Sequence, residues 1–257
     1  MELRVIGCHG GETPKHRTSA FVVDDRLAID AGALTSEMEL KAQCALQAVL
    51  VSHAHLDHVR DLSTIADNRL QNGAPPLVVA ATKATIGILK KHFFNDLLWP
   101  DFSKLPNRRH AAIQYLELDP EKAVSIAGYE VNAIRVSHTI DTCGFTVRGR
   151  SGVLAYSGDT GPTDRFWQVL SKTPDLKALL MEVSFPNAEA KLARASGHHT
   201  PETLAKDMRK LGAERAKELP TLLYHIKPSF QATVERECAK LKGLNLTVCA
   251  LRDHFIL

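Results

Sequence analysis

The chain has 257 residues, of which 44% are hydrophobic and 24% charged, and its formal net charge at pH 7 is +3. A chain of this length and composition is globular and can bury a sizeable core without disulfides to hold it together. The mild charge, with no block of Lys or Arg, permits an anionic ligand but argues against binding to large nucleic acids.

The five cysteines are scattered along the chain and form no Cys-x-x-Cys pair. This pattern predicts free thiols in a reducing compartment rather than a disulfide framework. The first residues contain no apolar run as long as that of a signal peptide, and no stretch approaches the roughly 20 apolar residues of a membrane span. We therefore expect a cytoplasmic protein without a membrane partner.

The first half of the chain alternates short apolar runs with segments of helical periodicity. The runs, each closed by Gly, Asp or polar residues, predict strands at 3–8, 20–24, 27–30, 48–51 and 77–81. Apolar residues at helical spacing predict helices at 37–47, 56–70 and 83–93. The stretch 95–110 contains two prolines and no clear periodicity, so it is predicted to be a loop or an inserted cap.

The second half begins with a meander of strands and then alternates helices and strands. Strands are predicted at 113–118, 123–126, 129–136, 145–147, 153–156, 178–183, 222–225 and 246–251. Helices are predicted near 164–172, 201–211 and 230–241. Strands flanked by helices in both halves indicate sheets with helices on the outside.

The segment His53-Ala54-His55-Leu56-Asp57-His58 places four potential metal ligands within six residues, directly after a predicted buried strand. Side chains alternate in extended backbone, so His53 and His55 point the same way and can bind one metal. Asp57 and His58, where the next helix begins, can bind a second metal nearby. Histidine and aspartate together suit zinc, and iron or manganese also accept them. The alternative, a polar loop at a helix start, does not account for such a density of ligands.

Three further potential ligands, His138, Asp159 and His225, each lie where a predicted strand ends. Ligands in open α/β sheets bind beyond the carboxyl ends of the strands. The glycines beside Asp159 allow the chain to turn tightly around its carboxylate. A site with two metals needs about seven or eight ligand atoms, so we expect these residues to complete it.

Together, the His53–His58 motif, His138, Asp159 and His225 resemble the pattern of the metallo-β-lactamase superfamily. The resemblance implies an α/β fold, an αββα sandwich of four layers. It also implies a single hydrolase domain over residues 1–257, with a cap-like insertion near 94–110. Two divalent metal ions are implied as cofactors, with Zn²⁺ as the first expectation and Mn²⁺ or Fe as alternatives.

The same resemblance implies a role for each ligand. One metal would be bound by His53, His55 and His138, the other by Asp57, His58 and His225, and Asp159 would bridge both. Asp30 matches an early aspartate of the superfamily that normally supports the metal ligands from behind. A complete ligand set argues against a degenerate member without metals.

Four further motifs narrow the resemblance: Gly7–Gly11, Phe94-Asn95 with Trp99-Pro100, Glu182–Asn187 and Gly197–Pro201. They are similar to motifs of the class II cyclic-nucleotide phosphodiesterases. That family usually has leucine where this chain has His199, so His198 aligns with the family's histidine. The resemblance implies hydrolysis of a 3′,5′-cyclic nucleotide to a 5′-monophosphate, or of a cyclic dinucleotide.

His198 and His199 precede a predicted helix start, with Thr200 as N-cap and Pro201 in the first turn. The positive end of that helix favours a neutral imidazole just before it. RNA-processing members of the superfamily place a proton-donating histidine at a similar motif. The candidate catalytic residues are therefore His198 and Asp57, and His199 is assigned a supporting role. The alternatives are His199 as the proton donor, or two loop histidines bonded to backbone.

The insertion is rich in aromatic and basic residues. Its aromatic side chains can stack on a base, or they can form a hydrophobic cap or a dimer contact, which is the simpler interpretation. They are Phe93, Phe94, Trp99 and Phe102. Its basic side chains can steer a phosphate or simply form a solvated face, and these are Lys104, Arg108 and Arg109.

The mechanistic hypothesis is attack on phosphorus by a hydroxide that bridges two metals, with His198 protonating the leaving oxygen. Alternatives on the same scaffold are an RNA 3′-end processing endonuclease and a thioester or lactam hydrolase. A non-catalytic nucleotide sensor is an alternative of a different class. The chain lacks the Gly-rich, basic arm of many RNA-processing relatives, and its complete ligand set argues against a sensor. We expect a small-molecule nucleotide as the partner, and a homodimer is compatible with the sequence.

Overall fold

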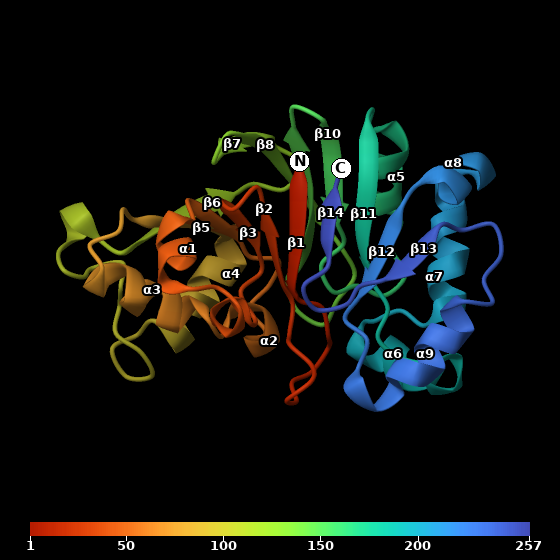
Figure 1. The fold of residues 1–257 in the computed structure, drawn as a ribbon, viewed down its shortest axis with the longest axis horizontal. Coiled ribbons are helices and arrows are strands. Elements are labelled where there is room, and N and C mark those ends of the chain that lie inside the picture. The colour runs from red at the N-terminus through yellow and green to blue at the C-terminus, as the bar shows by residue number, and fades with distance from the viewer.

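The computed structural model describes all 257 residues. Two seven-stranded sheets face each other in the middle of the molecule, and helices cover their outer faces on both sides (Figure 1). This arrangement confirms the predicted αββα sandwich. None of the helices combines the length and the apolar character needed to cross a bilayer.

The first sheet is built mainly from the first half of the chain, in the order β14-β1-β2-β3-β4-β5-β6. Its strands are β1 (Glu2–Gly7), β2 (Ala20–Val23), β3 (Leu27–Ile29), β4 (Ala48–Leu50), β5 (Leu77–Thr82), β6 (Ile113–Leu118) and β14 (His254–Ile256). Strands β3 to β6 pair in parallel, and β14, β1, β2 and β3 pair antiparallel.

The second sheet has the order β13-β12-β11-β10-β9-β8-β7. Its strands are β7 (Val124–Ile126), β8 (Tyr129–Arg135), β9 (Cys143–Gly149), β10 (Gly152–Tyr156), β11 (Leu176–Glu182), β12 (Thr221–Tyr224) and β13 (Leu246–Val248). Strands β7 to β10 form the predicted antiparallel meander, whereas β10 to β13 are parallel.

Nine α-helices connect the strands or cover the sheets. They are α1 (Leu40–Ala45), α2 (Leu56–Val59), α3 (Leu62–Gln71), α4 (Lys83–Ile88), α5 (Arg165–Lys172), α6 (Ala190–Ser196), α7 (Pro201–Met208), α8 (Ala213–Glu218) and α9 (Gln231–Cys238). Helix α7 begins as predicted, because Thr200 caps it and Pro201 occupies its first turn. Single turns of other helical types occur at Leu34–Ser36, Leu89–Phe93, Arg108–His110, Asn187–Glu189, Arg209–Leu211 and Pro228–Phe230.

Three hydrophobic clusters correspond to the three contacts between the four layers. The central cluster joins the inner faces of the two sheets and includes Phe21, Phe145 and Tyr156. A second cluster packs α3 and α4 on the first sheet, and a third packs α5, α7 and α9 on the second. The five cysteines are free thiols, and four of them are buried in this packing.

The structure corrects several predicted elements. The helix expected over 56–70 is broken into α2 and α3, because the Asp61 N–H and the His58 carbonyl both bond to the backbone of Ala31 and not to each helix's own backbone. The helix expected over 37–47 is reduced to Leu40–Ala45. Helices α6 and α8 and strand β14 were not predicted, since each is too short to show a clear period.

Candidate metal centre

Four loops at one edge of the two sheets carry the residues expected to bind metal. They follow β4, β8, β10 and β12, and α2 begins at the end of the first loop, at the bottom of the view in Figure 1. The side chains that these loops bring together are His53, His55, Asp57, His58, His138, Asp159 and His225. The first four belong to the first sheet's side and the last three to the second's.

Three imidazoles form one group of potential ligands. The His55 Nδ1 atom lies 3.0 Å from His53 Nε2 and 3.2 Å from His138 Nε2. One nitrogen from each of the three rings lies within 4.8 Å of the other two. A single cation can therefore contact all three rings.

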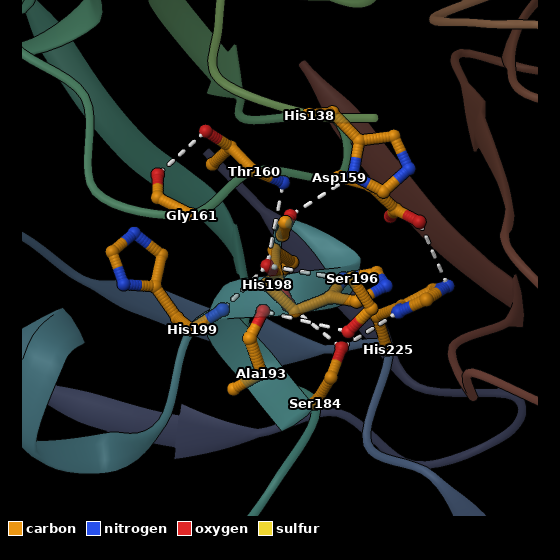
Figure 2. Close-up of polar contacts among 12 residues, drawn as sticks. His138, Asp159, Thr160, Gly161, Ser184, Ala193, Ser196, His198, His199 and His225 are labelled. Atoms are coloured by element: carbon orange, nitrogen blue, oxygen red, sulfur yellow. Dashed lines mark hydrogen bonds and ion pairs between the residues drawn. The ribbon is translucent and has the colours of Figure 1, made fainter. Parts of the chain in front are cut away.

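Asp57, His58 and His225 form the second group. The His225 Nε2 atom lies 3.3 Å from Asp57 Oδ2, and His58 Nε2 lies 3.9 Å from the same oxygen. Asp159 lies between the groups, with Oδ2 at 3.1 Å from His225 Nε2, 3.2 Å from His58 Nε2 and 3.9 Å from His53 Nε2. Figure 2 shows its carboxylate directed toward the His225 ring. One carboxylate thus reaches both groups.

Two atoms of this cluster, His58 Nε2 and Asp159 Oδ1, are buried and have no hydrogen-bond partner. Buried polar atoms without partners are rare and call for an explanation such as an ion. Imidazole and carboxylate donors at this spacing are the ligands that zinc and other transition metals take in proteins. The residues present therefore fit a pair of divalent cations.

The electrostatics of the cluster agree with this fit. Burial lowers the pKa of four imidazoles and so favours the neutral form that binds metal; these are His53, His55, His138 and His225. Burial also lowers the pKa of His58, but the carboxylates of Asp159 and Asp30 outweigh it and raise that pKa well above its ordinary value. The negative potential that holds a proton on His58 is the potential that attracts a cation.

His198 lies against the ligand cluster, and its ring is 7% exposed. Its centroid is 5.2 Å from that of His225, with the rings stacked, and 5.0 Å from that of His138. The His198 Nδ1 atom lies 3.4 Å from Oε1 of the fully buried Glu182. Burial lowers the pKa of His198, but the Glu182 carboxylate outweighs it and raises that pKa. The Glu182 carboxylate thus orients the His198 ring beside the cluster.

His199 points away from the cluster, as Figure 2 shows. Its Nδ1 atom lies 3.0 Å from the hydroxyl of Thr203, and its Nε2 atom lies 3.8 Å from the Asp207 carboxylate. Its backbone N–H donates to Glu182 Oε1 at 2.9 Å. Of the two neighbouring histidines, only His198 therefore faces the potential ligands, while His199 holds the loop that carries it.

Comparison with known protein families identifies the superfamily to which this chain belongs. Residues 27–225 match the model of the β-lactamase superfamily domain. The chain belongs to the β-lactamase superfamily. With the His and Asp cluster of that superfamily present, it is a metal-dependent hydrolase.

Two relatives of this chain are named 3′,5′-cyclic-nucleotide phosphodiesterases. The chain is 29% identical to a probable 3′,5′-cyclic-nucleotide phosphodiesterase of Yersinia pestis, over 90% of this chain and 79% of that protein. It is 32% identical to the 3′,5′-cyclic-nucleotide phosphodiesterase of Aliivibrio fischeri, over 72% of this chain and 61% of that protein. The match thus spans about three fifths of the Aliivibrio protein.

Solved structures of the superfamily share the fold. Unliganded yeast PDE1 superposes with a TM-score of 0.81 at 20% identity, over 98% of each chain. The metallo-β-lactamase fold protein YhfI of Bacillus subtilis superposes with a TM-score of 0.77 at 17% identity, over 99% of this chain and 98% of that one. At these identities the likeness concerns the fold alone.

Asp30, the early aspartate of the superfamily pattern, is fully buried behind the ligand cluster. Its carboxylate lies 2.7 Å from His58 Nδ1 and accepts hydrogen bonds from the backbone N–H and the hydroxyl of Ser52, each at 2.8 Å. The Tyr156 hydroxyl donates to the same carboxylate. Asp30 thus fixes the ring of His58 and leaves its Nε2 atom free to face the cluster.

Replacing Asp30 by asparagine is expected to weaken metal binding by about 10- to 100-fold, the usual effect of losing such a support. An amide cannot accept all the hydrogen bonds that this carboxylate accepts. The measurement is titration of metal into the metal-free variant against a competing chelator. Asp24→Asn is the matched control, because Asp24 also accepts from a tyrosine hydroxyl and a backbone N–H but belongs to no ligand group. Equal affinities for the two variants would contradict the role of Asp30.

Two of the potential ligands, His225 and Asp159, depend on an unusual backbone conformation. His225 has a φ of 68°, in the left-handed region that non-glycine residues seldom adopt, directly after β12. Its N–H donates to the Cys8 carbonyl at 2.7 Å, which holds it there. Gly158, before Asp159, has a φ of 62°, and a Cβ on it would lie 2.8 Å from the Cys143 carbonyl oxygen. The tight turn expected around Asp159 therefore requires this glycine.

The four aromatic residues between positions 93 and 102 mostly serve packing. Phe94 and Phe102 are buried in the second hydrophobic cluster, and Phe93 packs against it. Trp99 is 38% exposed, so it alone of the four presents a sizeable aromatic surface. Lys104 forms a surface ion pair with Asp101 at 2.8 Å.

Glu182 is a residue whose role sequence reasoning missed. Its carboxylate contacts His198 and also accepts from the N–H groups of Thr160 and His199 and from the hydroxyl of Ser184. It thereby ties together the three loops around His198. The sequence could have indicated this role, because Glu182 is a carboxylate at the end of an apolar predicted strand. The same pattern drew attention to Asp159.

Proposed function

We propose that this protein hydrolyses one phosphodiester bond of a 3′,5′-cyclic nucleotide to give the 5′-monophosphate. The observation that carries the proposal is the position of His198, which Glu182 holds against the ring of His225. A proton donor at that place is needed when the leaving group is a sugar alkoxide, which leaves poorly without a proton. The shared name of the curated relatives supports the same substrate class.

The seven clustered side chains would hold two divalent cations, for which Zn²⁺ is the first choice and Mn²⁺ or Fe are alternatives. His53, His55 and His138 would hold one, Asp57, His58 and His225 the other, and Asp159 both. Such a pair lowers the pKa of water and neutralises charge on phosphoryl oxygens.

The chain's own residues have three tasks in this reaction. Asp57, whose side chain is 30% exposed, orients the attacking water by accepting a hydrogen bond. His198 gives its proton to the departing oxygen, and the buried Glu182 stabilises the protonated ring and fixes its direction. The Gly197 carbonyl, 2.9 Å from His138 Nδ1, sets the tautomer of that ring so that Nε2 faces the cluster.

The proposal is tested with a substrate panel on protein loaded separately with Zn²⁺, Mn²⁺ and Fe²⁺. Turnover is expected with a cyclic mononucleotide or a cyclic dinucleotide, with weaker turnover of bis(p-nitrophenyl) phosphate. A thioester and a β-lactam are included in the same panel to test the alternative activities of thioester and lactam hydrolysis. Preference for either of them, or inactivity toward every phosphodiester with every metal, would reject the proposal.

An RNA substrate is separated from a small nucleotide by the salt dependence of affinity. A folded RNA makes many phosphate contacts and gives a steep loss of affinity with salt. We expect a shallow dependence here, measured as the Michaelis constant for the preferred nucleotide between 50 and 200 mM salt. A steep slope together with cleavage of precursor RNA would favour the endonuclease.

A further inference from the structure

Lys227 is a half-buried cation two residues beyond His225, and it forms no ion pair within the structure. Its stem lies beside the His225 ring, because a Cβ on Gly10 would lie 2.9 Å from Lys227 Cδ and 3.1 Å from His225 Nδ1. The carboxylates nearest to those rings, Asp57, Asp159 and Glu182, are paired with histidines and not with Lys227.

The backbone around Lys227 is fixed on both sides. Its N–H donates to the Ser184 carbonyl at 3.2 Å, and its own carbonyl accepts from the N–H of Phe230 at 2.9 Å. This holds the single helical turn Pro228–Phe230 directly after it. The Phe230 ring packs on Phe185, whose ring in turn lies 5.8 Å from that of His198. The turn that carries Lys227 is therefore part of the wall of the site.

Two glycines far away in the sequence make room for the side chains of Lys227 and Pro228. A Cβ on Gly10 would lie 2.9 Å from Lys227 Cδ and 2.4 Å from the His225 carbonyl oxygen. A Cβ on Gly11 would lie 3.1 Å from Pro228 Cδ. The Gly10 N–H donates to the Ile226 carbonyl at 3.0 Å, which keeps the two segments together. The stem of Lys227 is thus packed against Gly10, beside the ligand cluster.

An unpaired ammonium beside a cluster suited to two cations is unfavourable by itself, because like charges repel. An anion between them removes the repulsion and gains a charge-assisted hydrogen bond. We propose that the Lys227 ammonium binds an anionic oxygen of the substrate's phosphoryl group at the His198–His225 side of the site. This inference rests on the proposed function for the identity of the anion, a phosphodiester.

The first test measures binding, not turnover. Inorganic phosphate is titrated calorimetrically into metal-loaded wild-type protein, Lys227→Met and Lys227→Arg. Loss of one charge-assisted hydrogen bond is expected to weaken phosphate binding to Lys227→Met by about tenfold or more, whereas Lys227→Arg keeps most of the affinity. Lys217→Met is the matched control, since Lys217 is an unpaired lysine of α8 outside the ligand cluster, and it should bind like wild type. Lys227→Gln replaces Lys227→Met if the latter does not fold.

The second test separates this inference from the proposed function. In turnover of a cyclic nucleotide, Lys227→Met should raise the Michaelis constant about tenfold with a smaller change in kcat, because ground-state contact is lost. Wild-type phosphate affinity in Lys227→Met overturns the inference even if the enzyme hydrolyses cyclic nucleotides. Lysine-dependent phosphate binding by a protein that hydrolyses none of them keeps the inference and rejects the proposed function.

Discussion

Asp159→Asn is expected to lose more than about a hundredfold in turnover and at least part of its bound metal. Removing a residue that merely supports a ligand already costs about 10- to 100-fold, and Asp159 contacts the imidazoles directly. Its Oδ2 atom lies within 3.9 Å of His53, His58 and His225, so the substitution removes the only carboxylate between the two groups. The size of the side chain is kept, so the packing around it changes little.

The measurement combines metal analysis of the purified variant with turnover of the preferred nucleotide. Asp119→Asn serves as control, because Asp119 pairs only with exposed Lys122 at the surface and should keep wild-type metal content and rate. Full occupancy by two metals and a near-normal rate in Asp159→Asn would show that this carboxylate does not bridge the cluster.

His198→Gln is expected to lower kcat for a cyclic nucleotide by about 10²–10⁴-fold, the usual contribution of a positioned general acid. Glutamine is chosen over alanine because His198 is nearly buried and a cavity would disturb its neighbours. The loss should be much smaller with bis(p-nitrophenyl) phosphate, whose leaving group departs without a proton.

Both substrates are compared on one preparation, with metal content measured alongside. His92→Gln is the control, since His92 is an exposed histidine of the turn Leu89–Phe93 and should leave both rates unchanged. An equal loss with both substrates, at unchanged metal content, would assign His198 to binding or packing and remove it from proton transfer.

The clustering of the seven potential ligands could be predicted because it depends on short-range rules. Alternation in extended backbone places His53 and His55 on one side, and strand ends gather at one edge of a sheet. The early aspartate Asp30 followed from resemblance alone, since nothing in its local sequence shows that it meets His58.

The remaining features depend on contacts between distant segments, which periodicity does not show. The break between α2 and α3 arises where Asp61 and His58 form backbone hydrogen bonds to Ala31. The role of Glu182 depends on which face of β11 it occupies and on the loop of His198. The packing of the Lys227 side chain depends on Gly10, which lies more than 200 residues earlier in the sequence.

Each of the two groups combines side chains from the loops of both sheets, and the two sides' nearest members in sequence, His58 and His138, are separated by strands β5 to β8. No fragment that folds only one sheet can therefore contain a complete set of ligands. A polypeptide growing on the ribosome can assemble the full set of potential ligands only after β12 has been made and has docked, because His225 follows that strand. Any shorter folded intermediate therefore holds an incomplete set.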